Sequence, residues 1–314
     1  IVLGEDVGKK GGVFLATDGL WAEFGDDRVI DTPLTESMIV GASIGAAVNG
    51  LRPVAEIQFA DFIFPAFNQI VSEAARMRYR SNNGYGVPMT IRAPYGGGVH
   101  GALYHSQSVE AFFTHVPGLK VVVPSTPYDA RGLLRSSIRD DDPVLFFEHK
   151  KMYRSVRGDV PDTDYTVPLG KAKITHPGSQ VTVVAYGLMA HYALEAADQV
   201  ADDGISAEVV DLRTLRPLDR ETLLDSVRKT GKCLVVYEDN FSISVGSEVA
   251  ALIADEAWRS LDGPVKRLGG LDVPAMRYAK PMDNFFMIDP EKIDYAVNEV
   301  WAFQDTADSH PGSD

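Results

Sequence analysis

The chain has 314 residues, of which 45% are hydrophobic and 24% charged, and its formal net charge is −14. This composition is typical of a globular protein with about two domains, and no apolar run reaches the roughly eighteen residues of a transmembrane helix. The negative charge disfavours nucleic acid and anionic membranes as partners. The single cysteine, Cys233, excludes an internal disulfide and fits a reducing compartment. Because the chain begins in the apolar run Ile1-Val2-Leu3 without an initiator methionine, we expect residues to be missing before it.

The first half of the sequence alternates between predicted helices and strands. Helices are expected at 37–49, 65–81 and 108–115 and from Thr126 onwards, and strands at 53–59, 88–92, 119–123 and 144–148. Thr126, Pro127 and Asp129 form a helix start, because they supply a cap, a proline in the first turn and an acidic residue. Strands separated by helices predict a mostly parallel sheet with helices on its faces.

The second half repeats this pattern after an interruption. Residues 151–179 are rich in Pro, Asp, Lys and Arg and are interpreted as a linker. Strands are then expected at 181–185, 207–212, 233–237 and 265–268, and helices at 189–203, 219–230, 246–261 and 290–303. The sequence therefore predicts an α/β domain over 1–150, a linker over 151–179, a second α/β domain over 180–303 and a polar tail over 304–314.

Glu36 is the first candidate functional residue. It precedes a helix made largely of small residues, including Gly41 and Gly45, although glycine costs about 1 kcal/mol relative to alanine in a helix interior. Small residues allow another backbone or a ligand to approach closely, so we expect Glu36 to begin a buried element, where burial would raise a carboxyl pKa. The alternative is an acidic residue that complements the helix dipole.

A glycine-rich segment after the strand at 88–92 is the second candidate. Gly96, Gly98 and Gly101 match the dinucleotide-binding spacing, but the acidic residue that binds ribose is missing after the next strand, which ends at Val123. His100 and His105 lie in this segment, where α/β proteins place ligands and catalytic groups, and a structural role is equally open. The acidic run at 140–142 is either a solvated turn or a site for a hard cation.

Several motifs occur together in one family. Over essentially its full length, the chain resembles the beta subunit of the thiamine-diphosphate-dependent decarboxylating component of 2-oxoacid dehydrogenase complexes. The matching segments are residues 3–8, 31–36, 50–53, 58–62, 105–108, 117–122 and 211–215. The resemblance implies an α/β fold with two domains: a thiamine-diphosphate-binding, pyrimidine-type domain followed by a transketolase C-terminal-type domain.

The resemblance also implies roles for individual residues. Glu36 matches the glutamate that hydrogen-bonds a ring nitrogen of the cofactor's aminopyrimidine, and Phe62 matches the aromatic residue that packs against that ring. His105 matches a histidine that orients the substrate and helps to pass the acyl group to the lipoyl arm. A structural potassium ion is implied at four further positions: Met89, Ser137, Asp140 and Asp142.

The sequence contains no Gly-Asp-Gly motif, which thiamine-diphosphate enzymes use to hold the diphosphate through magnesium. The resemblance therefore implies half of an active site, with magnesium held mainly by a separate alpha subunit in an α2β2 heterotetramer. It also implies docking on a lipoyl-bearing dihydrolipoyl acyltransferase core whose binding domain is basic. A cytoplasmic location is expected, or the mitochondrial matrix for a eukaryotic source.

The substrate is less sharply defined. The segments 101–105 and 146–148 resemble branched-chain 2-oxoacid members more than pyruvate members, and pyruvate or acetoin dehydrogenase remains an alternative. A self-sufficient transketolase-like enzyme and a non-catalytic scaffolding subunit are further alternatives. Around 237–243 and at Met276 the sequence departs from the family pattern, which leaves the docking residues open.

Overall fold

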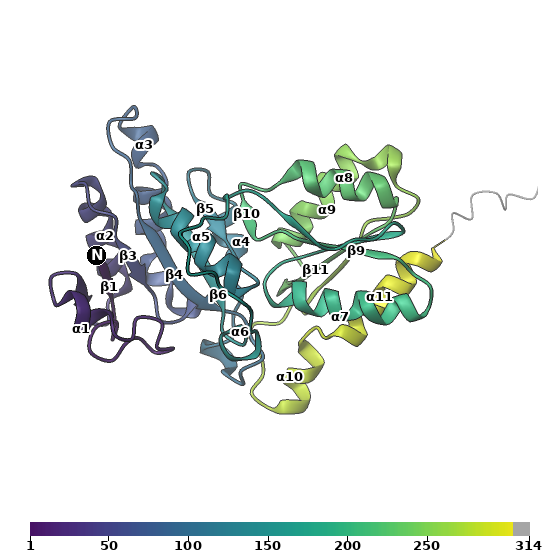
Figure 1. Ribbon diagram of the computed structural model, residues 1–314, viewed down its shortest axis with the longest axis horizontal. Coiled ribbons are helices and arrows are strands. Elements are labelled where there is room, and N and C mark those ends of the chain that lie inside the picture. Colours follow the sequence, from purple (N-terminus) through teal and green to yellow (C-terminus); the bar gives the residue numbers. More distant parts are fainter. Residues whose placement is uncertain (304–314) are drawn as a thin grey trace, which may run out of the picture. The chain divides into compact units, whose positions relative to one another are not determined.

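The computed structural model describes residues 1–303, which form two compact α/β units (Figure 1). The first unit contains Ile1–Lys171, Arg213–Leu218 and Val273–Met287, and the second contains Ala172–Leu212, Asp219–Asp272 and the chain from Ile288. The polar tail predicted at 304–314 lies outside the described residues. Among the helices described, none combines the length and the apolar character needed to cross a membrane.

The first unit is built on a seven-stranded sheet in the order β10-β5-β6-β4-β3-β1-β2. All neighbouring pairs are parallel except β10 with β5. The strands are β1 (Val2–Gly4), β2 (Val29–Asp31), β3 (Val54–Glu56), β4 (Thr90–Tyr95), β5 (Lys120–Val122), β6 (Val144–His149) and β10 (Thr214–Arg216). The mostly parallel sheet predicted from the sequence is therefore confirmed, whereas the strands β1, β2 and β10 were not predicted.

Two of the predicted helices are the long helices of this unit. α2 (Glu36–Val48) ends before Gly50, whose φ of +93° is the left-handed conformation that glycine adopts most readily. α5 (Pro127–Arg139) begins as predicted, because the Thr126 hydroxyl accepts a hydrogen bond from the Asp129 N–H. The shorter helices are α1 (Leu20–Phe24), α3 (Met77–Arg80), α4 (Glu110–Thr114), α6 (Met152–Ser155) and α10 (Lys280–Phe286).

The continuous helix predicted over 65–81 is wrong. The chain forms a 3-10 turn at Phe64–Ala66, a π-helical segment at Gln69–Ala74 and then the short helix α3. Gly118 of a separate loop, with φ of +96°, approaches this break so closely that a Cβ on it would lie 2.1 Å from the Ala75 carbonyl oxygen. The amphipathic pattern indicates which face of a helix is buried, but it does not indicate that a separate loop packs against the backbone of that helix and interrupts it.

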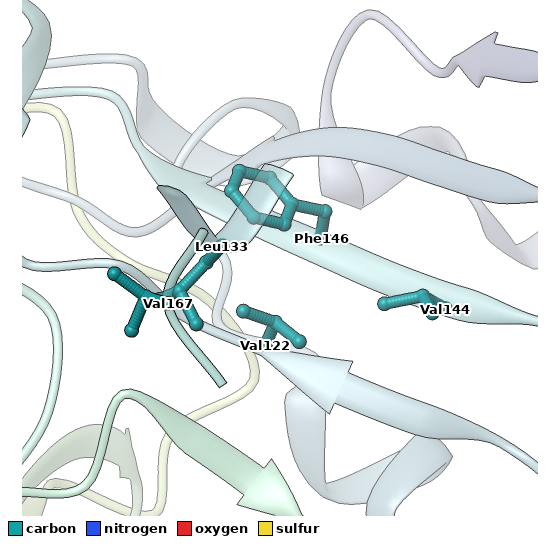
Figure 2. Packing of buried hydrophobic residues seen from close by; sticks show 5 residues of the cluster. All are labelled: Val122, Leu133, Val144, Phe146 and Val167. Carbon is teal, nitrogen blue, oxygen red and sulfur yellow. The ribbon is translucent and has the colours of Figure 1, made fainter. Parts of the chain in front are cut away.

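A buried apolar cluster holds α5 against the sheet. Figure 2 shows Leu133 of α5 and Val167 beside Val122 and Phe146, with Val144 further along β6, the strand that carries Phe146. Each fully buried aliphatic side chain of this kind contributes about 1.5–3 kcal/mol. This packing fixes the sheet whose strand ends carry the candidate residues.

The second unit contains a five-stranded sheet in the order β12-β11-β8-β9-β7, parallel except for the edge strand β7. α8 and α9 cover one face of this sheet, and α7 and α11 cover the other (Figure 1). The strands are β7 (Lys173–His176), β8 (Val181–Ala185), β9 (Ala207–Asp211), β11 (Cys233–Asn240) and β12 (Lys266–Gly270). The helices are α7 (Leu188–Asp202), α8 (Arg220–Thr230), α9 (Val245–Glu256) and α11 (Pro290–Ala302). All the strands and helices predicted for this half are present.

Candidate functional site

The candidate residues of the first unit follow the carboxyl ends of parallel strands. Because those ends meet at one edge of a parallel sheet, side chains in the segments that follow them gather there. Glu36 follows β2, Phe62 follows β3 and His105 follows β4. Lys150 directly follows β6, the neighbour of β4, and so reaches the same edge.

Glu36 is the first residue of α2 and is half-buried. The buried element predicted to begin at Glu36 is therefore buried on one face only. Ile39, Val40, Ser43, Ile44 and Ala47 are buried, whereas Met38, Ala42 and Gly45 are exposed. A second carboxylate lies nearby after β1: burial, followed by the negative charges of Asp6 and Glu36, raises the pKa of Glu5 above its usual range.

His105 and Phe62 are brought together in an aromatic cluster. The ring centroids of His105 and Phe59 lie 4.6 Å apart at an interplanar angle of 90°, and those of His105 and Phe62 lie 5.4 Å apart at 78°. Phe62 ends the 3-10 turn Ala60–Phe62, and His105 follows the 3-10 turn Ala102–Tyr104. Edge-to-face ring contacts of this kind hold the imidazole in one orientation.

Asp61 fixes the backbone on the carboxyl side of His105. One carboxylate oxygen accepts hydrogen bonds from the N–H groups of Ser106 and Gln107, each at 3.1 Å. The other oxygen lies 3.9 Å from the ammonium of Lys150, and both side chains are almost fully buried. Neither Asp61 nor Lys150 was predicted from the sequence to be functional. Only their positions in the sequence could have indicated a functional role, because Asp61 lies beside Phe62 and Lys150 follows a central strand of the sheet.

A buried ionic network at the ends of β3, β4 and β6 was also missed. The Arg92 guanidinium donates to Glu56 and to Glu148, each at 2.6 Å, and Tyr153 OH donates to Glu148 at 3.1 Å. Burial raises the pKa of Glu56 despite the neighbouring guanidinium. The Tyr153 ring packs on Phe14, which contacts Phe59, so the network supports the aromatic cluster.

The four residues predicted to hold potassium lie near the opposite edge of the sheet, at the amino ends of β4 and β6. Met89 and Ser137 are buried, and the Ser137 hydroxyl donates to the Leu133 carbonyl. The Lys120 ammonium lies 2.6 Å from Asp140 and 3.5 Å from Asp142, and the Arg78 guanidinium lies 2.6 Å from Asp142.

These two carboxylates are therefore neutralised from within the chain and fit potassium poorly as side-chain ligands. Within residues 1–303, no group of three or more His, Cys, Asp or Glu side chains is placed to hold a metal ion.

Known families match both halves of the chain. The family described as transketolase, pyrimidine binding domain, matches residues 1–156, and the family described as transketolase, C-terminal domain, matches residues 170–293. A solved structure described as a split gene transketolase, inactive beta4 tetramer, is 26% identical, has a TM-score of 0.77 and covers 96% of this chain and 91% of its own. The two family models and the shared fold thus define a protein of the transketolase type with both domains.

Two bacterial relatives narrow this class. The 2-oxoisovalerate dehydrogenase subunit beta of Bacillus subtilis is 59% identical over 302 residues, 96% of this chain and 92% of the relative. The pyruvate dehydrogenase E1 component subunit beta of the same organism is 52% identical over 272 residues, 87% of this chain and 84% of the relative. The chain belongs to the family of 2-oxoacid dehydrogenase beta subunits.

Proposed function

We propose that this chain is the beta subunit of a branched-chain 2-oxoacid dehydrogenase and contributes half of a thiamine-diphosphate site. The observation that carries the proposal is the contact of Phe62 with His105 at the edge of the sheet where the carboxyl end of β2 leads into Glu36. The 59% identity to a 2-oxoisovalerate dehydrogenase subunit beta favours a branched-chain substrate. The pyruvate relative, at 52%, makes pyruvate the second candidate.

The residues present fit one half of the cofactor. A half-buried carboxylate at Glu36 and the aromatic side chain of Phe62 suit an aminopyrimidine, which offers ring nitrogens and a flat face. The sequence lacks the Gly-Asp-Gly motif that would hold the diphosphate through magnesium. We therefore assign the magnesium and diphosphate contacts to an alpha subunit, in an α2β2 assembly. Potassium at Met89, Ser137, Asp140 and Asp142 would depend on carbonyl rather than carboxylate oxygens.

Thiamine diphosphate, when bound, would supply the nucleophilic carbon and the electron sink for decarboxylation of a 2-oxoacid. Glu36 would hold and exchange a proton at a pyrimidine ring nitrogen, and Phe62 would pack on the ring. His105, oriented by Phe59 and Phe62, would hydrogen-bond the substrate and then assist acyl transfer to a lipoyl group. The net charge of −14 suits docking on a basic domain of an acyltransferase core.

The proposal is tested by calorimetric titration of thiamine diphosphate with magnesium, into this chain alone and into its mixture with a candidate alpha subunit. We expect binding only in the mixture, because each chain would supply half of the contacts. The assembled enzyme should then have a higher kcat/KM for a branched-chain 2-oxoacid than for pyruvate. Tight binding to the isolated chain would contradict the shared site, and failure to bind in a stable assembly would contradict the function.

His105→Ala is expected to separate the two half-reactions. Lipoyl acylation should fall by about 10–100-fold, the usual contribution of a positioned acid or base. Decarboxylation with an artificial electron acceptor should stay within about threefold, because the imidazole is needed mainly for acyl transfer.

Both rates are measured on the assembled enzyme, with the exposed His115 replaced by Ala as the control. Equal losses in the two rates would argue against this division of roles.

A further inference from the structure

The loop that leads from β4 to His105 has an unusual backbone. Gly96 and Gly98 have φ of +83° and +73°, and His100 and Ala102 both have φ of +55°. A residue with a Cβ costs about 1 kcal/mol or more in this left-handed region. Such a conformation persists only if the surrounding structure holds it.

A segment that is distant in sequence packs against this loop. Residues 273–287 belong to the first unit, and two buried methionines of this segment cover Gly97. A Cβ on Gly97 would lie 2.4 Å from the Met276 sulfur and 3.1 Å from the Met287 sulfur, so the loop and the segment are in direct contact. We call residues 273–287 the clasp segment.

One polar contact joins the clasp segment to the loop. Asp283 of α10 is 3% exposed, and its carboxylate lies 2.9 Å from Nδ1 of the half-exposed His100. A buried carboxylate is costly unless it is paired and hydrogen-bonded, so the pair favours the observed position of His100. His105 is thereby bracketed by two anchored points, His100 before it and the two N–H groups bound by Asp61 after it.

We propose that Asp283, acting through His100, is a positioning residue that holds the loop of His105 in its working conformation. The structural part of the proposal depends only on contacts within the first unit. The catalytic part, that loop position controls lipoyl acylation, rests on the proposed function. The two parts are tested separately.

Hydrogen exchange of the full chain tests the clasp without substrate or cofactor. In Asp283→Ala, amides of 97–105 should exchange at least about tenfold faster, because the loop opens locally, while those of β4 and β6 stay protected. Asp283→Asn keeps an acceptor oxygen and should retain most of the protection, and Lys280→Ala, an exposed position in the same helix, should leave exchange unchanged. If the exchange of 97–105 were unchanged in Asp283→Ala, the proposal that Asp283 holds the loop would be wrong.

Kinetics of the assembled enzyme test the positioning role. Asp283→Ala should lower kcat for lipoyl acylation about tenfold and decarboxylation much less. Added to His105→Ala, it should cause little further loss, because both changes act through one imidazole. If Asp283→Ala speeds exchange in the loop but leaves the rate of lipoyl acylation unchanged, the positioning role is wrong. A wild-type assembly without lipoyl acylation would overturn the proposed function, and the exchange result would still stand.

Discussion

Glu36→Gln should remove at least about 99% of decarboxylation activity while leaving the fold intact, since positioned proton transfer contributes about 10²–10⁴-fold. The amide has nearly the volume of the carboxylate but cannot exchange a proton with a pyrimidine nitrogen. Glu36 is only half-buried in the first turn of α2, so the nearly isosteric change costs little stability. The measurement is the decarboxylation rate of the assembled enzyme with an artificial electron acceptor, alongside its thermal unfolding.

Glu23→Gln provides the control, because Glu23 is an exposed acidic residue in the first turn of α1. We expect it to keep the wild-type rate. Turnover of the Glu36→Gln enzyme within about threefold of wild type would remove Glu36 from the catalytic machinery.

Much of this architecture was predictable from the sequence because its signals are local. The Thr126 cap, Gly50 and the alternation of apolar strands with amphipathic helices define elements without any knowledge of their neighbours. Phe62 and His105 follow predicted strands and Glu36 precedes a predicted helix, and the motifs shared with the family single out these three residues. Their gathering at one edge then follows from the parallel order of the sheet.

The parts that could not be predicted depend on contacts between distant segments. The break between Ala74 and Met77 lies where the backbone of Gly118 packs, a contact that hydrophobic periodicity does not encode. Strand β10 joins the first sheet, and Asp283 reaches His100, only because the chain returns to the first unit twice, at 213–218 and at 273–287. Likewise, the acidic run at 140–142 suggested a cation site, whereas Lys120 and Arg78 neutralise two of its carboxylates.

Helix α2 buries only one of its faces inside this chain. A Cβ placed on Gly41 or Gly45 would meet no atom within 4 Å, so neither glycine is required by packing inside this chain. Glycine in a helix interior nevertheless costs about 1 kcal/mol relative to alanine. We infer that the exposed positions Ala42 and Gly45, with the half-buried Gly41 beside them, are kept small for the close approach of the alpha subunit.

Gly45→Leu should therefore leave the isolated chain as stable as the wild type, or more stable, and yet block assembly. The leucine raises helix propensity by nearly 1 kcal/mol, but it overpacks the contact by about 1–3 kcal/mol at each copy. A weakening of about 10–100-fold in alpha-subunit affinity is expected, with Gly45→Ala intermediate. Thermal unfolding of the chain alone and light scattering of the mixture at several concentrations measure the two effects. Gln199→Leu, an exposed position in α7, is the control. If the Gly45→Leu chain assembled with wild-type affinity, this face of α2 would not be the contact with the alpha subunit. A leucine side chain could not be accommodated in a contact whose close approach depends on glycine.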